Sequence, residues 1–69
     1  MDGLQGKVTL VTGGGSGIGR ATALAFARDS AHVIVAEQHV EAGEETVRLI
    51  EANGGSALFI WMDVRQAAT

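Results

Sequence analysis

A chain of 69 residues without a single cysteine can form one small domain or part of a larger one, and it excludes both disulfide bonds and cysteine-based metal sites. Its hydrophobic fraction of 46%, against 19% charged residues, favours a packed fold over a disordered segment. The net charge of -3, the scattered basic residues and the lack of a secretory signal or a membrane-length apolar stretch predict a cytoplasmic protein that binds neither nucleic acid nor a membrane.

The first half of the chain predicts a strand, a helix and a second strand. Residues 7–12 (KVTLVT) are mostly β-branched or apolar and precede three glycines, which is typical of a buried strand. Residues 18–29 (IGRATALAFARD) carry alanine and leucine at helical density, with an apolar stripe on one face, and predict a helix. Residues 32–36 (HVIVA) predict a short second strand.

The second half predicts another helix and a third strand. Residues 40–53 place their apolar side chains on one stripe and most of their glutamates off it, which indicates an amphipathic helix. The Asn-Gly-Gly at 53–55 is typical of a helix C-terminus. Residues 56–62 (SALFIWM) are one continuous apolar run, so we expect a third buried strand.

This alternation predicts an α/β fold in which β-α-β-α-β forms the first half of a doubly wound parallel (Rossmann) sheet. In the usual strand order of that fold, the first strand pairs with a fourth strand, which these elements do not supply. We therefore expect a sheet that is incomplete in this chain and whose first strand has an unpaired apolar edge.

The turn between the first strand and the first helix carries most of the chemical information. Most positions between 13 and 19 are glycine, which lets the backbone adopt positive φ and approach a phosphate without a Cβ in the way. The helix that begins here directs its free N–H groups and roughly half a positive charge at the turn. A P-loop is excluded, because Arg20-Ala21 stands where Lys-Ser/Thr is required. A plain flexible turn is disfavoured by the entropy that so many glycines cost.

Several segments together resemble the opening of the short-chain dehydrogenase/reductase family. They are the Leu-x-Gly-Lys-Val at 4–8, the LVTGGGSGIG at 10–19, residues 21–27 and 33–36, and the Asp-Val at 63–64. The resemblance covers essentially the whole chain. It implies that residues 1–69 are the N-terminal part of one NAD(P)-binding Rossmann domain, with no second domain.

The resemblance also implies a role for individual residues in binding a dinucleotide. Three glycines would shape the turn: Gly13, Gly17 and Gly19. Ser16 and the backbone of Ile18 would meet the pyrophosphate, while Thr12 braces the turn. Asp63 would accept a hydrogen bond from the adenine amino group, and Val64 would pack beside the ring.

Glu37 points to NAD as the dinucleotide. It ends the second strand 18 residues after Gly19, close to the spacing of about 20 at which an acid is expected to accept hydrogen bonds from the ribose hydroxyls. A carboxylate there repels the 2′-phosphate of NADP, by about 4 kcal/mol for unit charges 4 Å apart at an effective dielectric of 20. NADP-preferring relatives usually have a basic residue where this chain has the neutral Ser16 and Gln38. NADP is therefore the less favoured cofactor.

The family resemblance implies hydride transfer between nicotinamide and an alcohol or ketone, with a Tyr-x-x-x-Lys pair and a serine as catalytic groups. The chain has no tyrosine, its only lysine is Lys7, and its serines lie outside the region of the family's catalytic serine. We therefore expect no catalytic residue here and no turnover by these 69 residues alone. A small alcohol or ketone would be the substrate of a longer parent, which we expect to be a homo-oligomer.

Two alternatives remain at the level of sequence. The chain could be a non-catalytic fragment that binds nucleotide weakly or docks onto a full-length relative through the edge of its first strand. A Rossmann-type methyltransferase or flavoprotein segment also fits the β-α-β outline, but it explains less well the spacing of the glycines and the Asp-Val at 63–64.

Other conspicuous side chains are expected to be structural. His32 and His39 have no acid or cysteine pattern beside them, so exposed or hydrogen-bonded histidines are expected rather than metal ligands. Trp61 is expected to pack in the core. Arg20 could approach a phosphate or lie at the surface.

Overall fold

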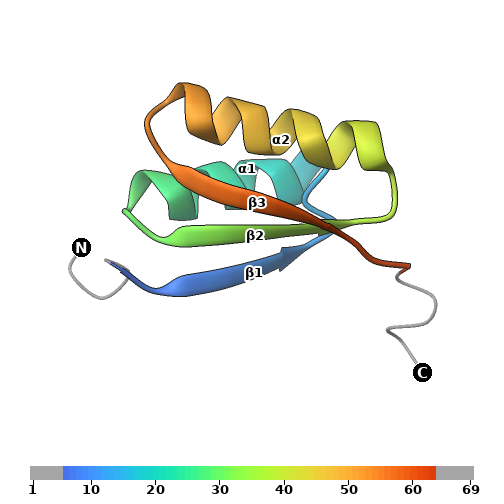
Figure 1. Ribbon diagram of the computed structural model, residues 1–69, viewed down its shortest axis with the longest axis horizontal. Coiled ribbons are helices and arrows are strands. Elements are labelled where there is room, and N and C mark those ends of the chain that lie inside the picture. The colour runs from blue at the N-terminus through green and yellow to red at the C-terminus, as the bar shows by residue number, and fades with distance from the viewer. Residues whose placement is uncertain (1–5, 64–69) are drawn as a thin grey trace.

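The computed structural model describes residues 6–63 (Figure 1). Its elements follow the predicted β-α-β-α-β order, and they run as follows: β1 Val8–Thr12, α1 Gly17–Arg28, β2 His32–Glu37, α2 Val40–Ala52 and β3 Ser56–Trp61. The predicted fold class is therefore confirmed. Boundaries differ from the predicted ones by at most one residue, and β2 extends far enough to include Glu37.

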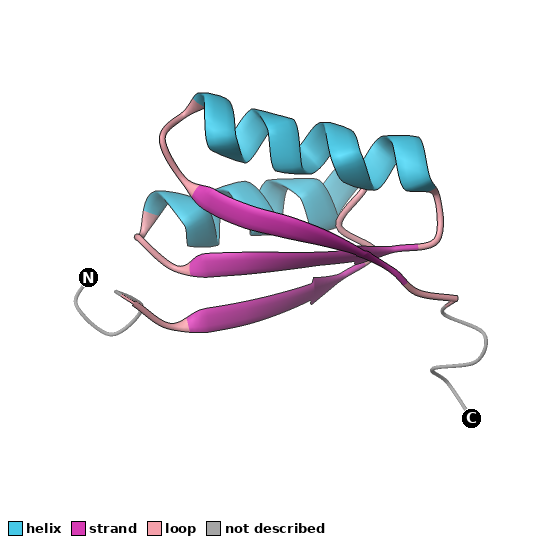
Figure 2. Ribbon diagram, viewed as in Figure 1, coloured by secondary structure: helices cyan, strands magenta, loops and turns pink. Residues whose placement is uncertain are grey.

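The sheet has three parallel strands in the order β1-β2-β3, with β2 at its centre (Figure 2). Each parallel pair is joined by a helical crossover. Both crossovers step in the same direction across the sheet, and right-handed connections of this kind place their helices on the same face. Figure 1 shows α1 and α2 side by side on that face.

The hydrophobic core lies between the sheet and the two helices. Its fully buried members come mainly from the central strand, with Val33 and Val35 meeting Ala23 of α1 and Ile50 of α2. At Gly43 the helix α2 lies so close to β3 that a Cβ would overlap the ring of Phe59. This close packing sets the position of α2 over the carboxyl end of the sheet.

Two of the three strands are less buried than their sequences predict. Because both helices cover one face, the apolar side chains on the other face are exposed: Val8, Leu10, Leu58 and Ile60. In the described residues β1 pairs only with β2 and forms an edge of the sheet, as expected. The prediction that the first and third strands are buried on both faces is therefore wrong for this part of the chain.

The prediction that Trp61 packs in the core is also wrong. Its side chain is 57% exposed, although the alternation of the strand places it on the same face as the packed Phe59. Trp61 is the last residue of β3 and its indole N–H donates a hydrogen bond to the carbonyl of Gln38, 3.1 Å away. The indole therefore lies over the β2–α2 connection.

Candidate functional site

The glycine turn lies at the carboxyl end of the sheet, between β1 and α1. Gly13 and Gly17 have φ angles of 68° and 57°, which side chains with a Cβ rarely adopt, and open space lies where their Cβ atoms would be. The N–H of Gly13 donates to the carbonyl of Ala36 at 2.8 Å, which joins the turn to β2. The turn is thus hydrogen-bonded to β2 at Gly13, and open space lies beside Gly13 and Gly17.

The start of α1 is held directly against this turn. A Cβ on Gly19 would overlap the carbonyl oxygen of Gly13, so the close approach requires glycine. Ser16 is the N-cap residue, is exposed, and makes no side-chain capping hydrogen bond. The hydroxyl of Ser16 and the unpaired N–H groups of the first helical turn can therefore donate to an anion.

Glu37 ends β2 beside the turn and is only 8% exposed. Its Oε1 accepts a hydrogen bond from the N–H of Gly15 at 2.9 Å. Its Oε2 accepts from the backbone N–H of His39 at 3.0 Å and lies 3.0 Å from Nδ1 of the same residue. The backbone N–H of His39 lowers the pKa of Glu37 most, burial opposes it, and the imidazole and Gly15 lower the pKa further. The site therefore holds a carboxylate at neutral pH.

Gly15 is a site residue that the sequence analysis did not single out. A Cβ there would lie 2.7 Å from Oε1 of Glu37, so the carboxylate occupies the space that a larger residue would fill. The sequence signal for this contact is general: an acid at the end of the second strand and a run of glycines after the first strand. Nothing in that pattern shows which glycine faces the acid.

Arg20 is not the free surface side chain that was one of the two roles considered for it. Its guanidinium donates to the carbonyl of Gly15 at 2.6 Å, to the carbonyl of Ala42 at 3.2 Å and to Oγ1 of Thr46 at 2.8 Å. Thr46 is fully buried, and the Arg20 side chain is half-buried. Arg20 therefore connects the glycine turn to α2.

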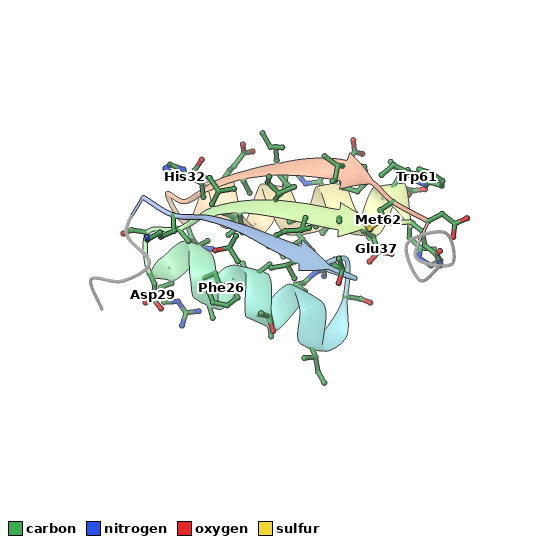
Figure 3. The ribbon with its side chains drawn as sticks, turned by 90° about the horizontal axis from the view of Figure 1, so that it is seen from below. Phe26, Asp29, His32, Glu37, Trp61 and Met62 are labelled. Atoms are coloured by element: carbon green, nitrogen blue, oxygen red, sulfur yellow. The ribbon has the colours of Figure 1, made fainter. Side chains whose placement is uncertain are left out.

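The remaining expected site residues lie at the same end of the sheet. Thr12 is the exposed last residue of β1, Ile18 is 86% exposed in the first turn of α1, and Asp63 is half-buried just after β3. Val64 lies outside the described residues. Figure 3 shows Glu37 and Trp61 at this end and His32 at the opposite end of β2.

Among residues 6–63, no three His, Cys, Asp or Glu side chains are grouped so that they could hold a metal ion. In the same part of the chain, neither helix has the length and apolar character needed to cross a membrane.

The sequence matches the family described as short chain dehydrogenase over residues 7–69. It is 50% identical over 64 residues to an uncharacterized oxidoreductase of Thermotoga maritima, covering 93% of this chain and 26% of that protein. It is 52% identical over 65 residues to the short chain dehydrogenase/reductase astE of Aspergillus oryzae, covering 93% and 25% respectively. The chain thus spans about a quarter of the length of these relatives.

Solved structures agree with this match. A hydroxysteroid dehydrogenase from Escherichia coli superposes with a TM-score of 0.86 at 36% identity, covering 88% of this chain and 26% of that one. A citronellol catabolism dehydrogenase (AtuB) of Pseudomonas aeruginosa superposes with a TM-score of 0.87 at 41% identity, covering 94% of this chain and 28% of that one.

Proposed function

This chain belongs to the short-chain dehydrogenase family, and on that premise we propose that it holds the adenosine and pyrophosphate of NAD as the N-terminal part, residues 1–69, of a single dinucleotide-binding domain. The family consists of oxidoreductases that bind NAD or NADP. The membership argues against the methyltransferase and flavoprotein alternatives. The described residues fit such a cofactor, because Gly13 and Gly17 leave open space and Gly19 brings the start of α1 to the turn.

The observation that carries the choice of NAD is the buried carboxylate of Glu37 beside the glycine turn. A carboxylate offers about four lone-pair sites, and donors from Gly15 and His39 use three of them. The remaining site, on Oε1, can accept a ribose hydroxyl. A 2′-phosphate would instead meet a negative charge held in a poorly solvated position.

The rest of the proposed site follows from its position at the same edge. The pyrophosphate would lie against Ser16, Gly17 and the N–H of Ile18, with Thr12 bracing the turn. Asp63 would accept a hydrogen bond from the adenine amino group, and Val64 would pack beside the ring. When NAD is bound, its nicotinamide accepts or donates the hydride that interconverts an alcohol and a ketone.

We place that reaction in a longer, cytoplasmic, homo-oligomeric protein. The 69 residues contain no tyrosine, so they do not contain the general acid/base that the family resemblance implies. Relatives that are dehydrogenases of a diol and of a hydroxysteroid support an alcohol as the substrate class.

One observation favours a second candidate function. The exposed apolar face of the described sheet, formed by Val8, Leu10, Leu58 and Ile60, fits a non-catalytic fragment that docks onto a full-length relative. Such a fragment would elute from a sizing column with the relative and would bind NAD weakly or not at all by itself.

Isothermal titration of the chain with NAD and with NADP tests the main proposal, with far-UV circular dichroism to establish that each variant is folded. NAD is expected to bind at least about tenfold more tightly, which is ~1.4 kcal/mol. Glu37→Gln should remove that preference, whereas Glu44→Gln, which makes the same charge change at an exposed position of α2, should keep it. Equal affinities in the wild type would contradict the role of Glu37, and no binding of either nucleotide by the folded chain would contradict the site.

A further inference from the structure

The guanidinium of Arg20 joins the glycine turn to α2. Its Nη2 donates to the carbonyl of Gly15 at 2.6 Å and to the carbonyl of Ala42 at 3.2 Å. Its Nε donates to Oγ1 of Thr46 at 2.8 Å, and the Thr46 hydroxyl donates in turn to the carbonyl of Ala42 at 3.3 Å. Thr46 is fully buried and the Arg20 side chain is half-buried, so the connection lies in the packed interior between the two helices.

Gly15 is held on both of its sides. Its N–H donates to Oε1 of Glu37 at 2.9 Å, and its carbonyl accepts from Arg20. In the trans peptide that joins Gly15 to Ser16, the carbonyl and the N–H point in opposite directions. Because the carbonyl of Gly15 is directed at Arg20, the N–H of Ser16 points away from the guanidinium.

The N–H groups that follow Gly15 are those that an anion can use. The first hydrogen bond of α1 runs from the N–H of Arg20 to the carbonyl of Ser16 at 3.3 Å, so the N–H groups of residues 16–19 have no partner inside the helix. Before them, the N–H groups of residues 13 and 14 donate to the carbonyl of Ala36 in β2. The bond from Arg20 to Gly15 is thus the last contact of the turn before those free donors begin.

Resting on the proposed function, we propose that Arg20 is a positioning residue for the pyrophosphate of the dinucleotide. By holding the carbonyl of Gly15 toward α2, it fixes the direction in which the N–H groups of residues 16–18 meet the phosphate oxygens. It does so through hydrogen bonds that require the planar guanidinium, rather than through its positive charge alone. Arg20 takes no part in hydride transfer.

The diphosphate is the part of the ligand that should respond to Arg20. Without the guanidinium the peptide between Gly15 and Ser16 is free to rotate, and ordering it again weakens the binding of the phosphates. The adenosine meets the ends of β2 and β3 in the proposed site, and the pairing of these strands sets their positions. The quantity that Arg20 controls is therefore the ratio of the dissociation constants of adenosine and ADP.

The test titrates the isotope-labelled chain with ADP and with adenosine by NMR, which measures weak dissociation constants and reports on the N–H groups of the turn. Arg20→Met removes the three hydrogen bonds and keeps an unbranched side chain. Arg20→Lys keeps the charge but not the planar donors. Arg48→Met is the matched control, because the Arg48 side chain is 70% exposed on α2 and pairs with Glu45. Circular dichroism establishes that each variant is folded.

The wild type and Arg48→Met should bind ADP more tightly than adenosine, with shifts in the N–H signals of residues 16–18. In Arg20→Met the ratio of the adenosine and ADP dissociation constants should fall about five- to tenfold, which is part of the contribution of one hydrogen bond to a charged group. In Arg20→Lys it should fall at least about threefold, because one ammonium cannot replace the donors of Nε and Nη2 together. The affinity for adenosine should stay within about twofold of the wild type in both variants, because the pairing of β2 with β3 does not depend on Arg20.

The other outcomes separate this proposal from the one it rests on. An unchanged ratio in folded Arg20→Met, including equal losses of affinity for adenosine and ADP, overturns the role of Arg20 and leaves the proposed site intact. A wild-type ratio in Arg20→Lys shows that charge is sufficient and also overturns it, and this variant decides the matter where Arg20→Met does not fold. Failure of the folded wild type to bind ADP more tightly than adenosine overturns both the pyrophosphate site and the role of Arg20.

Discussion

Replacing Gly15 with alanine tests whether the turn and the acid form one unit. The φ angle of Gly15 lies outside the left-handed region, so the backbone itself accepts alanine. The added Cβ would lie 2.7 Å from Oε1 and 2.8 Å from Cδ and Cγ of Glu37. These contacts are too short to persist, and the side chain of Glu37 must rotate away from the N–H of Gly15.

The destabilisation caused by Gly15→Ala follows from the loss of the hydrogen bond between the N–H of Gly15 and Oε1 of Glu37. A hydrogen bond to a charged group contributes about 1.5–3 kcal/mol, and glycine-to-alanine substitution at a compatible position returns about 0.4–1 kcal/mol by restricting the unfolded chain. The net loss in the free energy of unfolding should be about 0.5–2.5 kcal/mol. A domain of this size unfolds with a urea dependence of roughly 1 kcal/mol per molar, so the urea midpoint should fall by about 0.5–2.5 M.

A double-mutant cycle measured by urea unfolding, with circular dichroism as the signal, checks the reasoning. In a Glu37→Ala background the clash is absent, so Gly15→Ala should be neutral or stabilising by up to about 1 kcal/mol. The same destabilisation in both backgrounds would refute the coupling between Gly15 and Glu37. NAD affinity should fall in Gly15→Ala for the same reason, because the displaced carboxylate no longer faces the ribose.

Three further predictions concern stability. Arg20→Ala removes three hydrogen bonds and leaves the buried hydroxyl of Thr46 with its bond to Ala42 alone. Thermal unfolding should therefore show a loss of about 1–3 kcal/mol in the free energy of unfolding. A change within about 0.5 kcal/mol would contradict the role of Arg20 in connecting the glycine turn to α2. The folded-state pKa of Glu37 lies below its ordinary value of 4.5, so its stabilisation is present above that value and is lost as the pH falls through the folded-state pKa. Urea midpoints measured from pH 6 downwards should therefore fall more steeply in the wild type than in Glu37→Gln. If the two midpoints fell in parallel with pH, Glu37 would not be the source of the pH-dependent stabilisation. Val35→Ala creates a cavity at a fully buried position and should lower the free energy of unfolding by about 2 kcal/mol in urea. Leu58→Lys on the exposed face should change that free energy by less than about 0.5 kcal/mol. Similar losses at the two positions would show that the exposed face is covered in solution.

The sequence by itself was sufficient to predict the order of the elements and the position of the turn. Hydrophobic periodicity and the glycine run are local signals, and each was enough to identify the element beside it. Placing Glu37 at the same edge as the turn also required no coordinates, since the carboxyl ends of parallel strands meet there. The motif match extended this to the family, which the comparisons confirm.

Only the tertiary structure decided which side chains meet. Gly15 and Glu37 are 22 residues apart, and Arg20 and Thr46 are 26 apart, so no local pattern encodes either contact. The exposure of Leu58 and Ile60 was equally hidden, because an apolar strand reads as buried on both faces until the side on which both helices lie is known. Local composition determines which element forms, whereas the direction of the crossovers and the space left by each glycine determine which faces are covered and which polar groups are brought together.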